Sequence, residues 1–210
     1  MIDLIRSLNE IKNFKKTAED FKKIVFYSED NNYSFFFKNL IDELLKNKQK
    51  ISLITSDKDD IFLEYTDENI KTFNIPNFFM LQYFFSNINC KNFIFTTPDL
   101  GNGILNKSPF TNNYIYIFHS LISTSVAYKK NAFKNYDIFF CPTKLHFNEL
   151  KEYFENLKKE VKFIKVGYPK INELKNFKPI KVNKDNKILI APTWGSDGVI
   201  NKEEIFDLVN

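Results

Sequence analysis

The apolar positions of the chain change their spacing along its length. In residues 1–22 they recur every three or four positions (Leu4, Leu8, Ile11, Phe14, Ala18 and Phe21), which predicts an amphipathic helix. Its opposite face carries Arg6 and several lysines. We favour a helix packed on the domain surface. A peripheral contact with an anionic membrane is the alternative, because basic amphipathic helices lie at that interface.

Short apolar runs follow, and helical patterns separate several of them. The predicted strands are residues 23–27, 51–55, 70–73, 93–97, 114–118, 138–141 and 163–166. The predicted helices are residues 33–47, 76–89 and 144–159, and residues 61–65 fit either a short strand or a loop. Nearly continuous apolar strands that alternate with helices indicate a mostly parallel sheet with helices on both faces. The predicted class is therefore α/β and Rossmann-like, with right-handed crossovers.

The pattern changes after Pro169. Residues 175–187 are rich in Lys and Asn and are typical of a linker, while a new strand begins at residues 188–191 and a helix at residues 202–209. One strand and one helix cannot bury a core of their own. We therefore expect a domain at residues 23–174, a linker at 175–187, and at 188–210 the start of a second domain that continues past Asn210.

Composition and charge narrow the possible partners and the compartment. The 210 residues are 43% hydrophobic, enough for a sizeable core, and the net charge of +4 comes from lysines, since Arg6 is the single arginine. These lysines are dispersed and offset by 26 acidic residues, which argues against nucleic-acid binding. Two cysteines, Cys90 and Cys141, are too few for a disulfide framework and are typical of a reduced, cytoplasmic protein.

Motifs for metals, cofactors and membrane insertion are missing from the sequence. No Cys/His cluster has the spacing of metal ligands, so we expect no metal and no cofactor. No apolar run reaches the roughly 20 residues of a membrane span, and the N-terminus lacks a signal-peptide pattern.

Gly101-Asn102-Gly103 is a weak phosphate-loop candidate, because Asn106 stands where the dinucleotide fingerprint has its third glycine. A mobile loop is the better interpretation of that segment.

His119 is the leading candidate for chemistry. It ends the predicted strand 114–118, and an imidazole titrates near neutrality, which suits a general base. A hydrogen-bonded structural histidine fits the position equally well. Ser120 is a poor nucleophile for His119, because adjacent residues on a strand point to opposite faces. His146 lies in a predicted helix, where we favour a capping or surface role.

Polar residues also follow other predicted strands. Asp30, Asn31 and Asn32 come after the first strand, at the end that commonly faces the ligand crevice. We expect one of the two asparagines to cap the next helix. Asp99 could face the same crevice. The turn Gly195-Ser196-Asp197-Gly198 joins a strand to a helix N-terminus, which favours anions, although a plain turn fits as well.

Five segments together carry a family resemblance. They are IVFYSEDNNYSFFFKNLIDEL (24–44), YIYIFHS (114–120), AFKNYDIFFCPTKLHFNEL (132–150), VGYPKINEL (166–174) and ILIAPTWG (188–195). In order and rough spacing they resemble the CDP-glycerol glycerophosphotransferase family, which builds teichoic-acid-like and capsular polymers. The resemblance implies the N-terminal half of a two-domain, GT-B-like transferase. The N-terminal domain would bind the acceptor, the C-terminal domain the CDP-linked donor, and the protein would contact the inner membrane face peripherally.

The resemblance also implies roles for particular residues. His119 matches the family's histidine at a strand end, which deprotonates the acceptor hydroxyl that attacks the donor β-phosphate. The expected substrate-binding residues are Asp30, Asn31, Asn32, Ser120, Thr143 and Tyr168, and the expected donor-phosphate contacts are Gly195, Ser196 and Gly198. The chain departs from the family at Ser120-Leu121, where Gly-Thr is usual, and at Gly195, where Arg is frequent.

These residues lead to one expected function and two alternatives. We expect transfer of a glycerol-phosphate or other polyol-phosphate group from a CDP-activated donor to a cell-surface polymer or a lipid-linked acceptor. A nucleotide-sugar-dependent glycosyltransferase of capsule or lipopolysaccharide synthesis is the first alternative. A non-catalytic acceptor-binding module is the second.

Overall fold

The computed structural model describes residues 2–171, which belong to one compact unit, Met1–Lys175. The predicted linker at 175–187, the predicted second domain at 188–210 and the candidate residues Gly195, Ser196 and Gly198 lie outside the described residues. No helix within residues 2–171 combines the length and the apolar character needed to cross a membrane.

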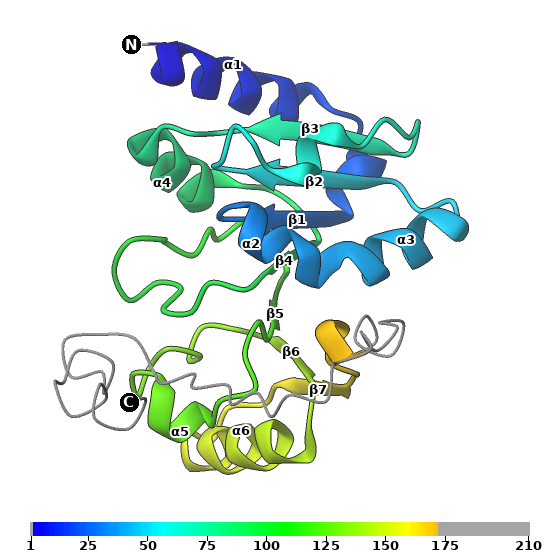
Figure 1. The fold of residues 1–210 in the computed structure, drawn as a ribbon. Coiled ribbons are helices and arrows are strands. Elements are labelled where there is room, and N and C mark those ends of the chain that lie inside the picture. The colour runs from blue at the N-terminus through cyan, green and yellow to red at the C-terminus, as the bar shows by residue number, and fades with distance from the viewer. Residues whose placement is uncertain (1, 172–210) are drawn as a thin grey trace, which may run out of the picture. The chain divides into compact units, whose positions relative to one another are not determined.

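A seven-stranded sheet runs through the middle of the described part (Figure 1). Its strands are β1 (Ile24–Ser28), β2 (Ile51–Thr55), β3 (Ile70–Asn74), β4 (Asn92–Phe95), β5 (Asn113–Ile117), β6 (Ile138–Cys141) and β7 (Lys162–Lys165). All neighbouring pairs are parallel, in the order β3-β2-β1-β4-β5-β6-β7. The predicted α/β, Rossmann-like class is confirmed.

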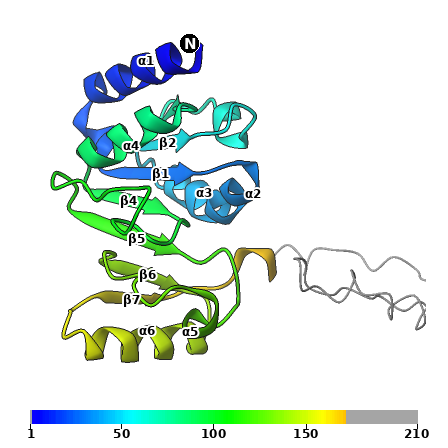
Figure 2. The same ribbon diagram turned by 90° about the vertical axis from the view of Figure 1, so that its left-hand side faces the viewer.

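Helices cover both faces of this sheet. They are α1 (Ile2–Lys16), α2 (Asn31–Ser34), α3 (Lys38–Lys46), α4 (Phe78–Asn87), α5 (Thr124–Ala127) and α6 (Lys144–Asn156), with 3-10 turns at Glu19–Lys22, Phe35–Phe37 and Ile61–Glu64. Figure 2 shows the strands stacked one above another, with α1 beyond one edge of the sheet and α6 beside β7.

Two predicted helices are shorter or more broken than expected. The helix predicted over residues 1–22 ends at Lys16, because Ala18 is extended (ψ 144°) and the chain then enters the 3-10 turn that buries Phe21. The helix predicted over 33–47 begins earlier, at Asn31, and is interrupted by the Phe35–Phe37 turn. The undecided segment 61–65 forms a 3-10 turn.

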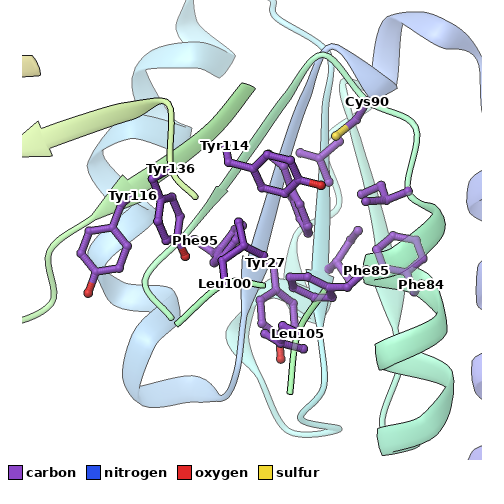
Figure 3. Packing of buried hydrophobic residues seen from close by; sticks show 14 of the residues in the cluster. Tyr27, Phe84, Phe85, Cys90, Phe95, Leu100, Leu105, Tyr114, Tyr116 and Tyr136 are labelled. Carbon is purple, nitrogen blue, oxygen red and sulfur yellow. The ribbon is translucent and has the colours of Figure 1, made fainter. Parts of the chain in front are cut away.

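Aromatic side chains fill the larger core, on the sheet face covered by α1, α4 and α6 (Figure 3). The Phe14 ring of α1 packs edge-on against Phe73 at 5.3 Å and against Phe84 of α4 at 5.2 Å. Such edge-to-face pairs add to the energy of apolar burial. Helix α1 is thus packed on the sheet through its second half, while Ile2 and Ile5 in its first turns are exposed.

A smaller core lies on the opposite face, beneath α3 and the Ile61–Glu64 turn. Phe26 and Phe37 meet there at 5.6 Å, and both are fully buried.

The two cysteines, Cys90 and Cys141, are buried and free. Burial raises the pKa of the Cys90 thiol to about 12 and that of Cys141 to about 11, so both remain protonated thiols at neutral pH.

Candidate active site at the carboxyl edge of the sheet

The strand order reverses between β1 and β4. From β1 the chain moves outward to β2 and β3, and from β4 it moves outward the other way to β5, β6 and β7. Ligands of open α/β sheets bind in the crevice outside the carboxyl ends of the strands at such a switch point. Here Glu29 follows β1 and Thr97 follows β4, and the Thr97 hydroxyl donates a hydrogen bond to the Glu29 carboxylate.

A pocket of about 520 Å³ lies at this switch point. Three of its lining residues are joined by hydrogen bonds: the Tyr27 hydroxyl lies 3.1 Å from Ser56 Oγ, which donates to the Glu29 carbonyl at 2.8 Å. One wall comes from α4 and the other from the loop after β4. The lining residues are Tyr27, Glu29, Ser56, Pro76, Phe78, Leu81, Thr97, Pro98, Asp99, Asn102, Gly103, Ile104, Leu105 and Lys129. The pocket is therefore largely apolar, with carboxylates and one ammonium group among its lining.

The loop that forms the second wall is tied down by its own hydrogen bonds. Gly101 donates its N–H to the Leu105 carbonyl at 2.6 Å, and Asn102 donates its N–H to the Asp99 carbonyl at 2.9 Å. The Asn135 amide donates to the Leu100 carbonyl at 2.7 Å. Because these backbone N–H groups are already used, the loop is a poor cradle for phosphate. It serves instead as a wall of the pocket.

Gly101 is required by the shape of this loop. Its φ is +73°, and a Cβ added there would lie 2.6 Å from Asn135 Nδ2. We expect Gly101→Ala to lower the free energy of unfolding by about 1–2 kcal/mol, and more if the Asn135 bond to Leu100 is lost. Urea unfolding measures this. Gly103→Ala is the matched control, because a Cβ at Gly103 meets nothing within 4 Å. Equal losses in the two variants would contradict the argument.

His119 stands at the carboxyl end of β5, one residue beyond buried Phe118. Its half-buried ring packs edge-on against Tyr33 at 5.2 Å and lies 6.2 Å from the Phe36 ring. The Tyr168 hydroxyl donates to the His119 carbonyl at 2.8 Å. Within residues 2–171, the buried Nδ1 atom has no well-formed hydrogen bond. The structure thus brings two predicted site residues together, His119 and Tyr168.

Burial lowers the pKa of His119, because a desolvated imidazole resists protonation. The Thr96 backbone and the Glu29 carboxylate act in the opposite direction, and the Lys170 ammonium adds to the lowering. The net effect keeps the ring neutral and able to accept a proton at pH 7.

Two side chains of opposite charge act on His119 from different elements. Glu29 follows β1, and Lys170 follows β7 in the chain, with its Nζ 5.1 Å from the centre of the Phe36 ring in the turn after α2. The Glu29 carboxylate raises the pKa of His119 and the Lys170 ammonium lowers it, so both charges reach the imidazole.

The residues after β1 shape the backbone of the edge. The Asp30 carboxylate caps α2 by accepting the Asn32 N–H at 2.7 Å, so the expectation of an asparagine cap is wrong. The cap moves because α2 begins at Asn31, earlier than predicted. Asn31 Oδ1 instead accepts the Ile61 N–H at 3.3 Å, and Asn32 is exposed.

Thr143 and Ser120 belong to a second polar cluster, beside α6. Thr143 caps α6, and its Oγ1 lies 2.7 Å from His146 Nδ1. The expectation of a capping or surface role for His146 is wrong, because His146 is fully buried and the cap is Thr143, which accepts the His146 N–H at 3.3 Å. Burial lowers the pKa of His146, and the Glu149 carboxylate and the backbone of Ser120 act in the opposite direction. The ring packs against Phe118, the residue before His119, at 4.6 Å.

Glu149 belongs to the same cluster. Its carboxylate accepts the Ser123 hydroxyl at 2.6 Å and both the N–H and the hydroxyl of Thr124 at 2.7 Å. These hydrogen bonds lower the pKa of Glu149 despite its partial burial. Ser120 Oγ accepts the Ile122 N–H at 3.3 Å within the same loop. The hydrogen bonds to Glu149 attach the loop that follows His119 to α6.

The residues of the site that were not predicted include Glu29, Thr97, Lys129 and Lys170. Glu29 and Thr97 could have been found, since both follow predicted strands at the crevice end. Lys129 and Lys170 carry no signal among the dispersed lysines. Within residues 2–171, no group of three or more His, Cys, Asp or Glu side chains is placed to hold a metal ion.

Comparison with known proteins finds no protein-family model, no curated protein and no solved structure that matches this chain.

Proposed function

We propose that the protein is a transferase that moves a glycerol-phosphate or other polyol-phosphate group from a CDP-activated donor to a hydroxyl of a cell-surface polymer or a lipid-linked acceptor. The observation that carries the proposal is the place of His119, a desolvated imidazole at the carboxyl edge of a parallel sheet, within the electrostatic influence of Glu29 and Lys170. The resemblance of five ordered segments supplies the class of donor.

In the proposed reaction His119 acts as general base. Its ring takes the proton of the acceptor hydroxyl as that oxygen attacks the β-phosphorus of the donor. A new oxygen–phosphorus bond forms, the bond between that phosphorus and the bridging oxygen breaks, and CMP leaves with the bridging oxygen. Little covalent chemistry falls to the protein in such a displacement, so positioning and charge stabilisation account for most of the rate.

The opposite charges of Glu29 and Lys170 give the two substrates different places. An anionic pyrophosphate is repelled by the carboxylate of Glu29 and attracted by the ammonium of Lys170. The donor phosphates would therefore lie at Lys170, and the acceptor hydroxyl nearer Glu29. The ring of Phe36 supports Lys170 from beneath, which reduces the side-chain freedom lost when a phosphate binds.

Release of CMP tests the proposal. The complete gene product, including any sequence beyond Asn210, is supplied with CDP-glycerol and a polyol-phosphate or glycolipid acceptor. We expect CMP release that depends on the acceptor, and we expect Lys170→Gln to raise KM for the donor roughly tenfold through loss of a charge-assisted contact. KM for the acceptor stays unchanged. Lys165→Gln is the matched control, because Lys165 also lies over a phenylalanine ring, that of Phe147 at 4.8 Å.

Other outcomes would select the alternatives. Turnover with UDP- or CMP-linked sugars in preference to CDP-glycerol would replace the proposal with a glycosyltransferase. Acceptor binding without turnover of any donor would indicate a binding module.

A further inference from the structure

The pocket at the switch point is built before any ligand arrives. Asp99 is held at φ 63°, a left-handed conformation that few residues other than glycine adopt. Its N–H donates to the Ala132 carbonyl at 2.9 Å, and the Asn102 side chain donates to the Asn131 carbonyl at 2.6 Å. An unusual backbone conformation persists where the surroundings over-determine it, and such positions gather at ligand sites. Here it places Asp99 in the pocket lining.

The polar groups of the pocket suit hydroxyl groups. The carboxylates of Glu29 and Asp99 accept hydrogen bonds, while Lys129 and Asn102 can donate them. Thr97 uses its hydroxyl on Glu29, which leaves the second carboxylate oxygen of Glu29 for a ligand. Donors and acceptors are thus both present, as a polyhydroxylated ligand requires.

The apolar walls suit the carbon skeleton of such a ligand. Phe78 and Leu81 come from α4, and Ile104 faces them from the loop after β4. Phe78 is 48% exposed and Ile104 is 60% exposed, so both offer apolar surface that a ligand can cover. A site with apolar walls and a few placed polar groups is the usual form of a small-molecule pocket, and about 520 Å³ is within the usual range of size.

The charges of the lining argue against a strongly charged ligand. Among the described residues that line the pocket, two are carboxylates and Lys129 is the one cation. A phosphate would meet two like charges, and an ammonium group would meet Lys129. An uncharged ligand avoids both repulsions.

We infer that this pocket binds an uncharged, hydroxylated group, a sugar ring or a polyol, and that it is the recognition subsite for the acceptor. The second part rests on the proposed function. Glu29 lines the pocket, and its carboxylate also acts on the pKa of His119, so under the proposed function the reacting hydroxyl of the acceptor lies at the part of the pocket formed by Glu29. The acceptor is then recognised through its neutral part, and its own phosphates remain outside the pocket.

Paired probes test the inference by ligand-observed NMR on the complete gene product. The neutral probes are methyl α-glucoside, methyl N-acetylglucosaminide and glycerol, at millimolar concentration. The anionic partners are glucose 1-phosphate and glycerol 3-phosphate, and glucosamine is the cationic probe. We expect saturation transfer to at least one neutral probe and weaker transfer to its charged counterpart.

Two variants locate that binding in the pocket. Asp99→Asn, which keeps a residue tolerant of the left-handed conformation, should raise the Kd of the neutral probe roughly tenfold through loss of a charged hydrogen-bond acceptor. Phe78→Ala should also raise this Kd, and because Phe78 is partly exposed the substitution leaves the buried core intact. Asp59→Asn, a change at an exposed carboxylate outside the pocket, should leave binding unchanged.

The inference is overturned if no neutral probe binds, if the phosphorylated or cationic probes bind better, or if Asp99→Asn and Asp59→Asn behave alike. The proposed function fails separately. If the protein binds the neutral probe but releases no CMP, the inference about the pocket stands and the proposed transferase activity is wrong. If it releases CMP without binding any neutral probe, the proposed activity stands and the inference about the pocket is wrong.

Discussion

His119→Ala is expected to lower kcat/KM for CMP release by roughly 10²–10⁴-fold, which is the usual contribution of a positioned general base. The reason lies in the surroundings of the ring. Tyr33 and Phe36 pack against it, and the loop that follows is hydrogen-bonded to Glu149 of α6. A base held in this way needs no search for its position when the acceptor binds. Steady-state kinetics at saturating donor measures the loss.

The pH profile separates a base from a structural residue. Burial lowers the pKa of His119 below its ordinary value of 6.5, so the ring is protonated and inactive only at lower pH. We expect kcat/KM of the native protein to rise with pH through a midpoint below 6.5 and then level off near neutrality. His119→Ala should lack this rise. The rise should survive in His146→Gln, since the chain has only these two histidines.

The lowered pKa values of the histidines also make the free energy of unfolding depend on pH. Protonation favours the unfolded chain here, whereas protonation of a histidine in a salt bridge would favour the folded chain. Because both histidines have lowered pKa values in the folded state, the unfolded chain binds protons first as the pH falls below about 6.5. Stability therefore decreases from that pH down to the folded-state values. Activity must be measured within the pH range where each variant stays folded.

Native-like turnover in folded His119→Ala at pH 7 would show that His119 is not the general base.

Much of the fold could be predicted because apolar side chains record burial. Strands such as IVFYS and ISLIT are buried on both faces in the structure, and a strand of that kind has a nearly continuous apolar sequence. The breaks in helices were harder to predict. Phe35, Phe36 and Phe37 continue an apolar run, yet they form a 3-10 turn that sends Phe37 into one core and Phe36 toward Tyr168.

The site was predicted only where it follows the ends of strands. His119 could be found because it ends an apolar strand, and Tyr168 because it follows the last strand. The pocket could not, because its outer wall is the loop from Pro98 to Leu105, whose path depends on bonds to residues 131–135. Such bonds join segments about 30 residues apart and leave no local pattern. Lys170 could not be predicted either, because the contact of its ammonium group with the Phe36 ring depends on the fold and leaves no pattern in the sequence.

Phe139→Ala is expected to lower the free energy of unfolding by about 3–5 kcal/mol, the usual range for a buried phenylalanine. Phe139 lies in β6, is completely buried, and joins the core over the sheet to α6. Its ring lies 5.3 Å from Phe154 of α6 and 5.9 Å from Phe163 of β7. The rings of Tyr136 and Tyr116 lie 5.9 Å and 6.2 Å from that of Phe139.

The size of the loss follows from how little these neighbours can move. Rings that come from two strands, a loop and a helix cannot all close on a cavity, so part of the volume stays empty and its lining loses contacts. A domain is stable by only about 5–15 kcal/mol in total, so urea unfolding should show a clearly lower midpoint.

Phe110→Ala is the control, because Phe110 is 58% exposed and its removal should cost little. A variant at Phe139 that unfolds with the native midpoint would mean that β6 and β7 are not packed on α6 as described. In that case the attachment of the loop after His119 to α6 would also be wrong, because the hydrogen bonds to Glu149 depend on the position of α6.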